Sequence, residues 1–172
     1  SPIKGLVESS IRSHLSAEQK ANLLYEAIVS EEADALVAKN VMEIINAGAD
    51  VNHVFTGGEA HGYKPIDVAL LRSKCSIISI LVDKGALTIT PSILDIRDDM
   101  GNTILHHLAS QDSCMSVIPI AVNIGLVKLL NVKNVLGETP IQVFIEKYHG
   151  GFNDGMVVRV SNFLQQRASN FH

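Results

Sequence analysis

The chain has 172 residues, which is enough for one domain with a substantial apolar core. Hydrophobic residues make up 47% of it and charged residues 19%, a composition that excludes a disordered chain. The formal net charge is −4 with no Lys/Arg cluster, so we expect no nucleic-acid binding. No apolar run reaches the roughly 18 residues of a membrane span, so we expect no membrane association.

Two cysteines, Cys75 and Cys114, are too few for a disulfide scaffold. They occupy equivalent positions in two repeated segments described below, and packed neighbouring helices would hold such positions about 8–10 Å apart. We therefore expect two free thiols, a reducing compartment and an intracellular, cytoplasmic protein. Because the chain begins with Ser1, we interpret it as part of a longer protein.

The first expected element is a helix over residues 1–15, which carries apolar residues at helical spacing. The stretch SAEQ at residues 16–19 is typical of a capping box and predicts that the next helix begins there. Ala21, Leu24 and Ile28 give this second helix one apolar face.

From there, two sequence words recur along the chain. One begins with glycine and opens an amphipathic helix, and the other is an apolar helix that ends on glycine. The first word reads GYKPIDVALL from Gly62, GNTILHHLAS from Gly101 and GETPIQVFIE from Gly137, and the second reads VMEIINAGADVN from Val41, IISILVDKGALT from Ile77 and IPIAVNIGLV from Ile118.

The spacing of these words predicts stacked helix–turn–helix repeats. Gly62 and Gly85 are 23 residues apart, and Gly101 and Gly125 are 24 apart. The connectors between units vary from 12 to 16 residues. A constant unit with variable connectors is typical of a solenoid, because each helix pair must match its neighbour whereas the connectors lie at one edge.

Local chemistry agrees with helices at these places. Pro65 and Pro140 fit the first turn of a helix, and Thr103 and Thr139 can cap one. The glycines that close the second word, Gly48, Gly85 and Gly125, should end their helices. A last helix from Asn153 should bury one face only.

The two words together resemble the ankyrin repeat, whose pattern is roughly G-x-T-P-L-H-x-A followed by V-x-x-L-L-x-x-G-A-D-V-N. The stretches GADVN at 48–52 and GETPI at 137–141 carry the resemblance most clearly. Lys64, Ile104, Asp67 and Gln142 depart from the pattern, so the repeats are divergent. The resemblance implies an all-α fold: an ankyrin-type solenoid of stacked helix-turn-helix repeats with hairpin or loop tips.

We therefore expect a single ankyrin repeat domain over residues 1–172. Its parts would be an N-terminal capping helix at 1–15, repeat 1 at 16–52, repeat 2 at 53–87, repeat 3 at 88–127, and repeat 4 with a C-terminal cap at 128–172.

The adjacent histidines of GNTILHHLAS raise the question of a metal or catalytic pair. Consecutive helical residues do not share a face, and a helical metal pair needs i, i+4 spacing with further ligands nearby. The resemblance gives His106 a structural role, tying its turn to a neighbouring repeat. We expect no catalytic residue, no metal and no cofactor, and hence no enzyme in this chain.

The long connectors are the candidate partner-binding tips. Their apolar side chains either fold back over the repeats or stay exposed as a contact patch, and both outcomes are open. The candidate partner-binding residues at the tips and at the first-helix starts are His53, Val54, Phe55, His61, Tyr63, Lys64, Asp67, Ile89, Ile93, Leu94 and Ile96.

The resemblance implies a monomeric protein–protein interaction module that binds a partner protein through its tips and concave face. The alternative is a targeting or substrate-recruiting domain of a larger enzyme, such as a bacterial effector that acts in the cytoplasm of a host cell. A third hypothesis concerns Asn52, which matches a position that is hydroxylated in some ankyrin repeats, although its side chain can equally hold the turn.

Overall fold

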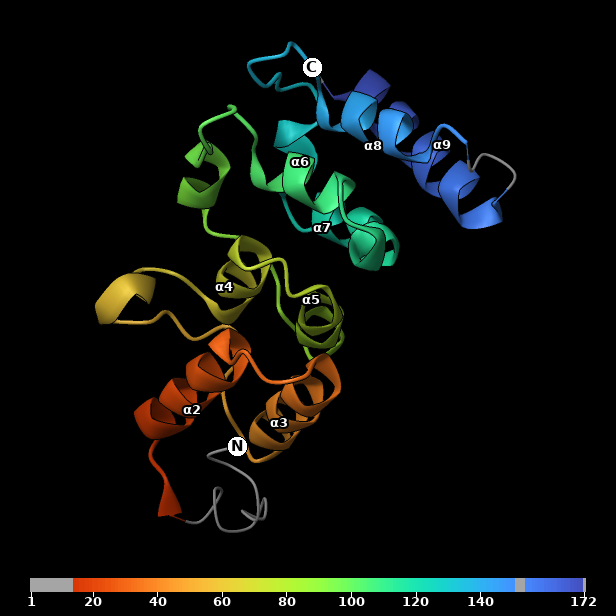
Figure 1. The fold of residues 1–172 in the computed structure, drawn as a ribbon. Coiled ribbons are helices and arrows are strands. Elements are labelled where there is room, and N and C mark those ends of the chain that lie inside the picture. Colours follow the sequence, from red (N-terminus) through yellow and green to blue (C-terminus); the bar gives the residue numbers. More distant parts are fainter. Residues whose placement is uncertain (1–13, 151–153, 172) are drawn as a thin grey trace. The chain divides into compact units, whose positions relative to one another are not determined.

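All regular structure in the described residues is helical. The computed structural model describes residues 14–150 and 154–171 (Figure 1). The expected capping helix at 1–15 lies almost wholly outside them. The α-helices are α2 (Ala17–Val29), α3 (Asp34–Asn46), α4 (Pro65–Leu71), α5 (Cys75–Asp83), α6 (Ile104–Ala109), α7 (Ile118–Asn123), α8 (Pro140–Tyr148) and α9 (Gly155–Asn170), and the 3-10 helices are η1 (Gly58–Ala60), η2 (Pro91–Asp95), η3 (Asp112–Val117) and η4 (Leu126–Leu129).

The prediction of an all-α chain is thus confirmed within the described part of the sequence. No helix in that part is long and apolar enough to cross a membrane. The chain divides into two compact units, unit 1 at residues 1–87 and unit 2 at residues 88–172.

Unit 1 consists of two helix pairs packed against each other. Helix α2 packs on α3 and α4 packs on α5, and the pairs join through α2 against α4 and α3 against α5. The side chains between them are apolar and fully buried, as the spacing of three and four along the sequence predicts. Among them are Leu24, Ile28, Ile44, Ile66, Leu70, Ile78 and Leu81.

Unit 2 repeats this plan with one difference. Helix α6 packs on α8, α7 packs on α9, and α8 and α9 form the last pair. The second helix of its first pair is divided into η3 and α7, with Pro119 in the first turn of α7. Proline has no N–H to continue the hydrogen bonding of a preceding turn, so it is tolerated where the new helix begins.

The first helix of each pair begins with the same hydrogen bond. The residue that caps the helix donates its backbone N–H to the side chain three residues later, which satisfies a group that the helix leaves unpaired. The four bonds run from Ser16 to Gln19 Oε1 (2.8 Å), from Lys64 to Asp67 Oδ2 (2.8 Å), from Thr103 to His106 Nδ1 (3.0 Å) and from Thr139 to Gln142 Oε1 (2.8 Å). The predicted capping box at 16–19 is confirmed.

Glycines end the second helices as predicted. Gly48 and Gly85 have φ of +107° and +105°, in the left-handed region that disfavours side chains. The next residue in each case, Ala49 or Ala86, donates its N–H back to the carbonyl five residues earlier, at 3.2 Å and 2.9 Å. This is the Schellman arrangement, which pairs carbonyl groups that the helix end leaves free.

Candidate partner-binding cleft

The candidate site residues of unit 1 lie around a loop at residues 53–63. The loop is closed by two backbone hydrogen bonds of 2.8 Å, one from Phe55 N to Tyr63 O and one from Gly62 N to Phe55 O. His61 adds a contact of 2.9 Å between its Nδ1 and the carbonyl oxygen of Thr56. The loop therefore has a defined shape, with η1 at its tip.

Phe55 holds this loop against the first helix. Its side chain is buried, and its ring meets the ring of Tyr25 edge to face, with centroids 5.5 Å apart and planes at 74°. The centroid of the His53 ring lies 5.7 Å from that of the Phe55 ring. Such edge-to-face pairs add to the stabilisation that burial itself provides.

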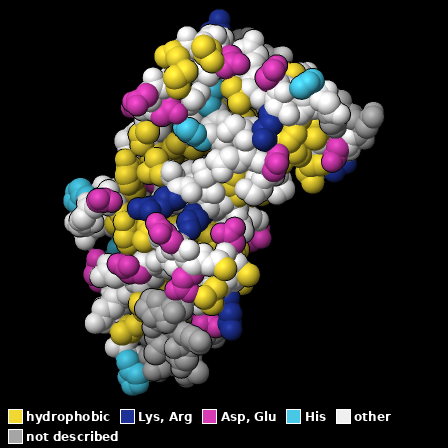
Figure 2. All heavy atoms as spheres, viewed as in Figure 1, with side chains coloured by type: hydrophobic (Ala, Val, Ile, Leu, Met, Phe, Trp, Pro, Cys, Tyr) yellow, Lys and Arg dark blue, Asp and Glu magenta, His cyan; other side chains and the backbone are white. Residues whose placement is uncertain are grey.

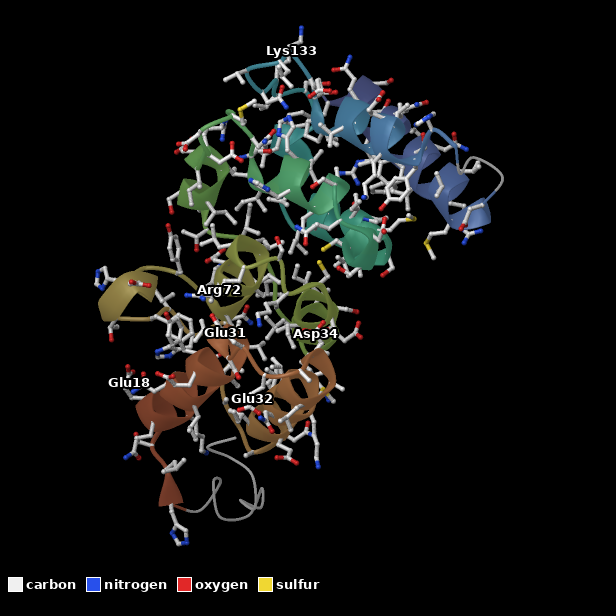
Figure 3. The ribbon with its side chains drawn as sticks, in the orientation of Figure 1. Glu18, Glu31, Glu32, Asp34, Arg72 and Lys133 are labelled. Atoms are coloured by element: carbon white, nitrogen blue, oxygen red, sulfur yellow. The ribbon has the colours of Figure 1, made fainter. Side chains whose placement is uncertain are left out.

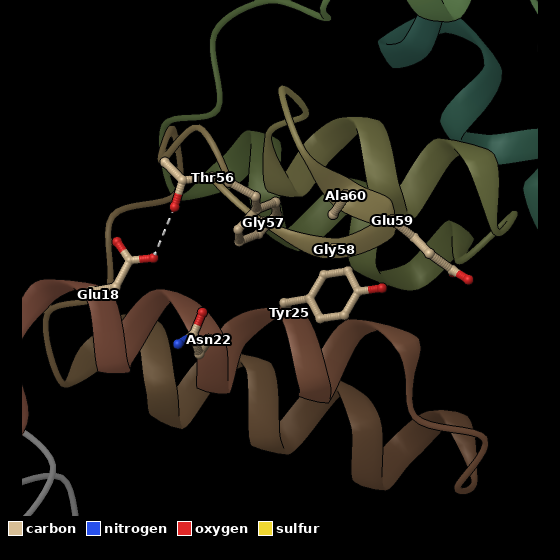
Figure 4. A pocket seen from close by; sticks show the side chains of 9 residues that line it. Glu18, Asn22, Tyr25, Thr56, Gly57, Gly58, Glu59 and Ala60 are labelled. Carbon is tan, nitrogen blue, oxygen red and sulfur yellow. Dashed lines mark hydrogen bonds between the residues drawn. The ribbon is translucent and has the colours of Figure 1, made fainter.

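A cleft of about 350 Å³ opens between α2 and this loop (Figure 4). Helix α2 contributes Glu18, Asn22 and Tyr25 to its lining, and the loop contributes residues 55–60. The spacing of four and three places the α2 residues on one face of the helix. A Cβ atom added at Gly57 or Gly58 would meet no atom within 4 Å, so the space beside these two glycines is empty.

The charges lining the cleft are all negative. Glu18 and Glu59 are exposed, and no Lys or Arg lines the cleft. Glu18 makes two long contacts, at 3.4 Å to Thr56 Oγ1 and at 3.4 Å to His53 Nε2. His53 Nε2 is buried and makes no hydrogen bond, and it offers Glu18 a positive charge only when the ring is protonated.

A second hollow, of about 300 Å³, continues the cleft towards α4. The two hollows share Tyr25, Glu59 and Ala60, and the second is also lined by Tyr63 and Arg72. Figure 3 shows Glu18 near the beginning of α2 and Arg72 where α4 ends. The two hollows together are therefore lined by two carboxylates, Glu18 and Glu59, and by the guanidinium of Arg72 at the α4 end.

Four candidate residues are buried and cannot form an exposed contact patch. Phe55 packs on Tyr25, and Asp67 is committed to the start of α4. In unit 2, Ile89 packs against Gly125, and Ile93 lies in η2, which packs on η4. The connectors that carry Phe55, Ile89 and Ile93 fold back over the helices, because burial removes these apolar side chains from water. Asp67 is buried for another reason, since its carboxylate accepts the Lys64 N–H at the start of α4.

The other candidates keep some exposure but do not form one site. Tyr63 is half-buried and lines the second hollow, whereas Val54 is 52% exposed and lines neither hollow. Lys64 and His53 are half-buried, and His61 is exposed. In unit 2, Leu94 is half-buried and Ile96 is 38% exposed.

Sequence reasoning missed the α2 side of the cleft. For this helix the sequence pattern indicated only the apolar face, and no role was assigned to Glu18, Asn22 or Tyr25. A signal was available, because Glu18, Asn22 and Tyr25 follow the spacing of four and three that puts residues on one face, and Tyr25 is a large aromatic residue beside the core residues Leu24 and Ile28.

The histidines of GNTILHHLAS serve different purposes. Buried His106 accepts the Thr103 N–H at Nδ1, and its Nε2 donates to the carbonyl oxygen of Glu138, 2.8 Å away, which links the α6 pair to the α8 pair. Burial lowers its pKa from the ordinary 6.5, against the opposing effect of the Glu138 carbonyl. His107 is exposed and pairs instead with Asp98 Oδ2, 3.0 Å away.

Neither Cys75 nor Cys114 is a free thiol, so the expectation of two free thiols is wrong. That expectation placed both residues near the start of regular second α-helices. Cys114 instead lies within the 3-10 helix η3, where the spacing of packed α-helices does not apply.

Asn52 has a structural role in the turn after α3. Its Nδ2 donates to the carbonyl oxygen of Gly85 at 3.0 Å, and its Oδ1 accepts from the N–H of Leu87 at 3.2 Å. The side chain thus joins the ends of the two second helices of unit 1.

Comparison of the chain with protein-family models gave no match, and comparison with curated proteins gave none either.

Proposed function

We propose that this chain is a protein-interaction module of the ankyrin type, and that its partner binds in the cleft between α2 and the 53–63 loop. One observation carries the proposal: a first helix and the adjacent tip loop together line a cleft large enough for several side chains of a partner. The repeated helix starts and the glycine helix ends support the ankyrin part of the proposal.

The proposal includes a monomer that carries out no reaction of its own. A targeting domain of a larger enzyme, including an effector that acts in a host cell, would use the same cleft to recruit its target. The two roles share a binding step and differ only in what is attached to the module.

The test is a substitution that fills the cleft without unfolding it. Asn22→Arg introduces a long side chain one turn after Glu18, where an i, i+4 ion pair favours the helix. A partner recovered by affinity capture should lose at least about tenfold in affinity, because the inserted side chain occupies its place. Lys39→Glu, on the exposed side of α3, serves as the control and should bind normally. Equal affinity for both variants would contradict the proposal.

A cytoplasmic location is also part of the proposal, and the bonded cysteines do not favour it. Alkylation of thiols at the moment of cell lysis decides the matter. A chain labelled at both cysteines supports a reducing compartment, and an unlabelled chain contradicts it.

A further inference from the structure

We infer that the cleft binds an extended basic segment of the partner protein, in which two Arg or Lys side chains about three residues apart face Glu18 and Glu59 across the ring of Tyr25. This inference rests on the proposed function and adds the chemistry of the partner. It follows from the charge, the aromatic wall and the length of the cleft.

The charge of the cleft selects a cation. Glu18 and Glu59 are exposed carboxylates with no Lys or Arg between them in the lining. Unit 1 as a whole has eleven acidic and eight basic residues, so it carries −3 of the formal −4. Acidic side chains are spread over the face of unit 1 that Figure 2 shows. A segment of like charge would be repelled, whereas a basic one is attracted before it makes contact.

The aromatic wall suits the same ligand. In Figure 4 the Tyr25 ring lies between Glu18 and Glu59, so a chain that joins the two carboxylates passes the ring. Phe55, which also lines the cleft, packs edge to face against the Tyr25 ring. A cation over an aromatic face gains roughly 0.5–1 kcal/mol at exposed sites. An arginine gains further, because its planar group can stack on the ring and bond a carboxylate with two N–H groups.

The length of the cleft sets the spacing of the cations. Glu18 and Tyr25 are seven residues apart on α2, which corresponds to about 10 Å at 1.5 Å per residue. Glu59 lies at the Tyr25 end, where both residues line the two hollows. A peptide in the extended polyproline II conformation covers about 9 Å in three residues and, with three residues per turn, places positions i and i+3 on the same side. The long side chains of Arg or Lys at positions i and i+3 supply the further reach to Glu59, which lies beyond the Tyr25 ring.

The far end of the cleft limits the basic segment. Arg72 is exposed and lines the second hollow beyond Glu59. A third cation placed there would meet a like charge, which disfavours longer basic runs.

The probe that tests this inference is acetyl-Arg-Gly-Gly-Arg-amide, and its control is the same peptide with citrulline in place of both arginines. Citrulline keeps the shape of arginine and removes its charge. Binding to the full chain is measured by the shifts of backbone amide resonances in two-dimensional NMR. The arginine peptide should move the amides of Thr56, Gly57 and Gly58 saturably, with at least about tenfold higher affinity than the citrulline peptide.

Paired variants locate the effect. Glu18→Gln with Glu59→Gln should reduce the affinity for the arginine peptide to that of the citrulline peptide. Asp83→Asn with Glu146→Gln removes the same charge from exposed positions outside the cleft and should leave the tenfold difference. The amide spectrum of each variant also shows whether it is folded.

Three results would overturn the inference: no saturable shift at about 10 mM arginine peptide, equal affinity for the two peptides, or an equal loss in both double variants. The proposed function is tested separately by Asn22→Arg, so the two can fail independently. If Asn22→Arg abolishes partner binding while the arginine peptide shows no preference, the cleft binds a partner of different chemistry.

Discussion

Replacement of Phe55 by alanine tests whether the tip loop is part of the core. The side chain is 5% exposed and packs on Tyr25 with ring centroids 5.5 Å apart. Truncation of a buried phenylalanine costs about 3–5 kcal/mol, because apolar contacts are lost and a cavity remains. A domain of this size has about 5–15 kcal/mol in total, so Phe55→Ala should lower the urea midpoint and the melting temperature markedly.

The neighbouring residue provides the control. Val54 is 52% exposed in the same loop, and Val54→Ala should change stability by no more than about 0.5 kcal/mol. A double-mutant cycle with Tyr25→Ala should show a coupling of about 0.5–1.5 kcal/mol between the two rings. If Phe55→Ala were no more destabilising than Val54→Ala, the loop would not be packed as described, and the cleft would lose its wall.

Three further perturbations have defined outcomes. Leu81→Ala, at a fully buried core position of α5, should cost about 2–5 kcal/mol in urea unfolding. Gly125→Ala should destabilise unit 2 by more than about 1 kcal/mol, because φ is +141° and the new Cβ would lie 2.6 Å from Ile89 Cγ1; hydrogen exchange on Ile89 reports it. His106 has a lowered pKa in the folded chain, so stability should be full above about pH 6.5 and fall as the unfolded chain takes up the proton at lower pH. The free energy of unfolding, measured with urea at pH 7 and pH 5, should fall less in His106→Gln than in the unchanged chain. Glutamine suits this position, since the equivalent Gln142 accepts the backbone N–H of Thr139 at the start of its own helix.

The helix ends could be predicted because their causes are local. Ser16 and Gln19 lie three residues apart and satisfy each other's backbone groups. Gly48 and Gly85 end their helices through bonds that reach back five residues. Patterns within such short distances determine these features, and the apolar spacing then indicates which face of each helix is buried.

The packing of the tips could not be predicted in the same way. Phe55 is buried by Tyr25, thirty residues earlier in the sequence, and nothing in the loop itself distinguishes a packed apolar residue from an exposed one. Ile89 is likewise held by Gly125, where only a glycine lets the isoleucine approach. Because the loop folds back onto α2, the cleft is formed by residues from two distant segments, and the sequence pointed to only one of them.

The cysteines show the limit of arguments from repeat geometry. Equivalent sequence positions were expected to occupy equivalent places in regular helices. The division of one second helix into η3 and α7 places Cys114 in a different local structure from Cys75, which lies at the start of α5.

Site-specific photo-crosslinking tests the central claim, that the cleft holds a partner protein, most directly. A benzophenone amino acid is placed at Asn22 or Thr56, which line the cleft, and at Lys39 as a control on the exposed side of α3. Both cleft positions should yield the same crosslinked protein, excess unlabelled chain should compete it away, and Lys39 should yield none. The same crosslinked protein from Lys39, or none from either cleft position, would contradict the central claim.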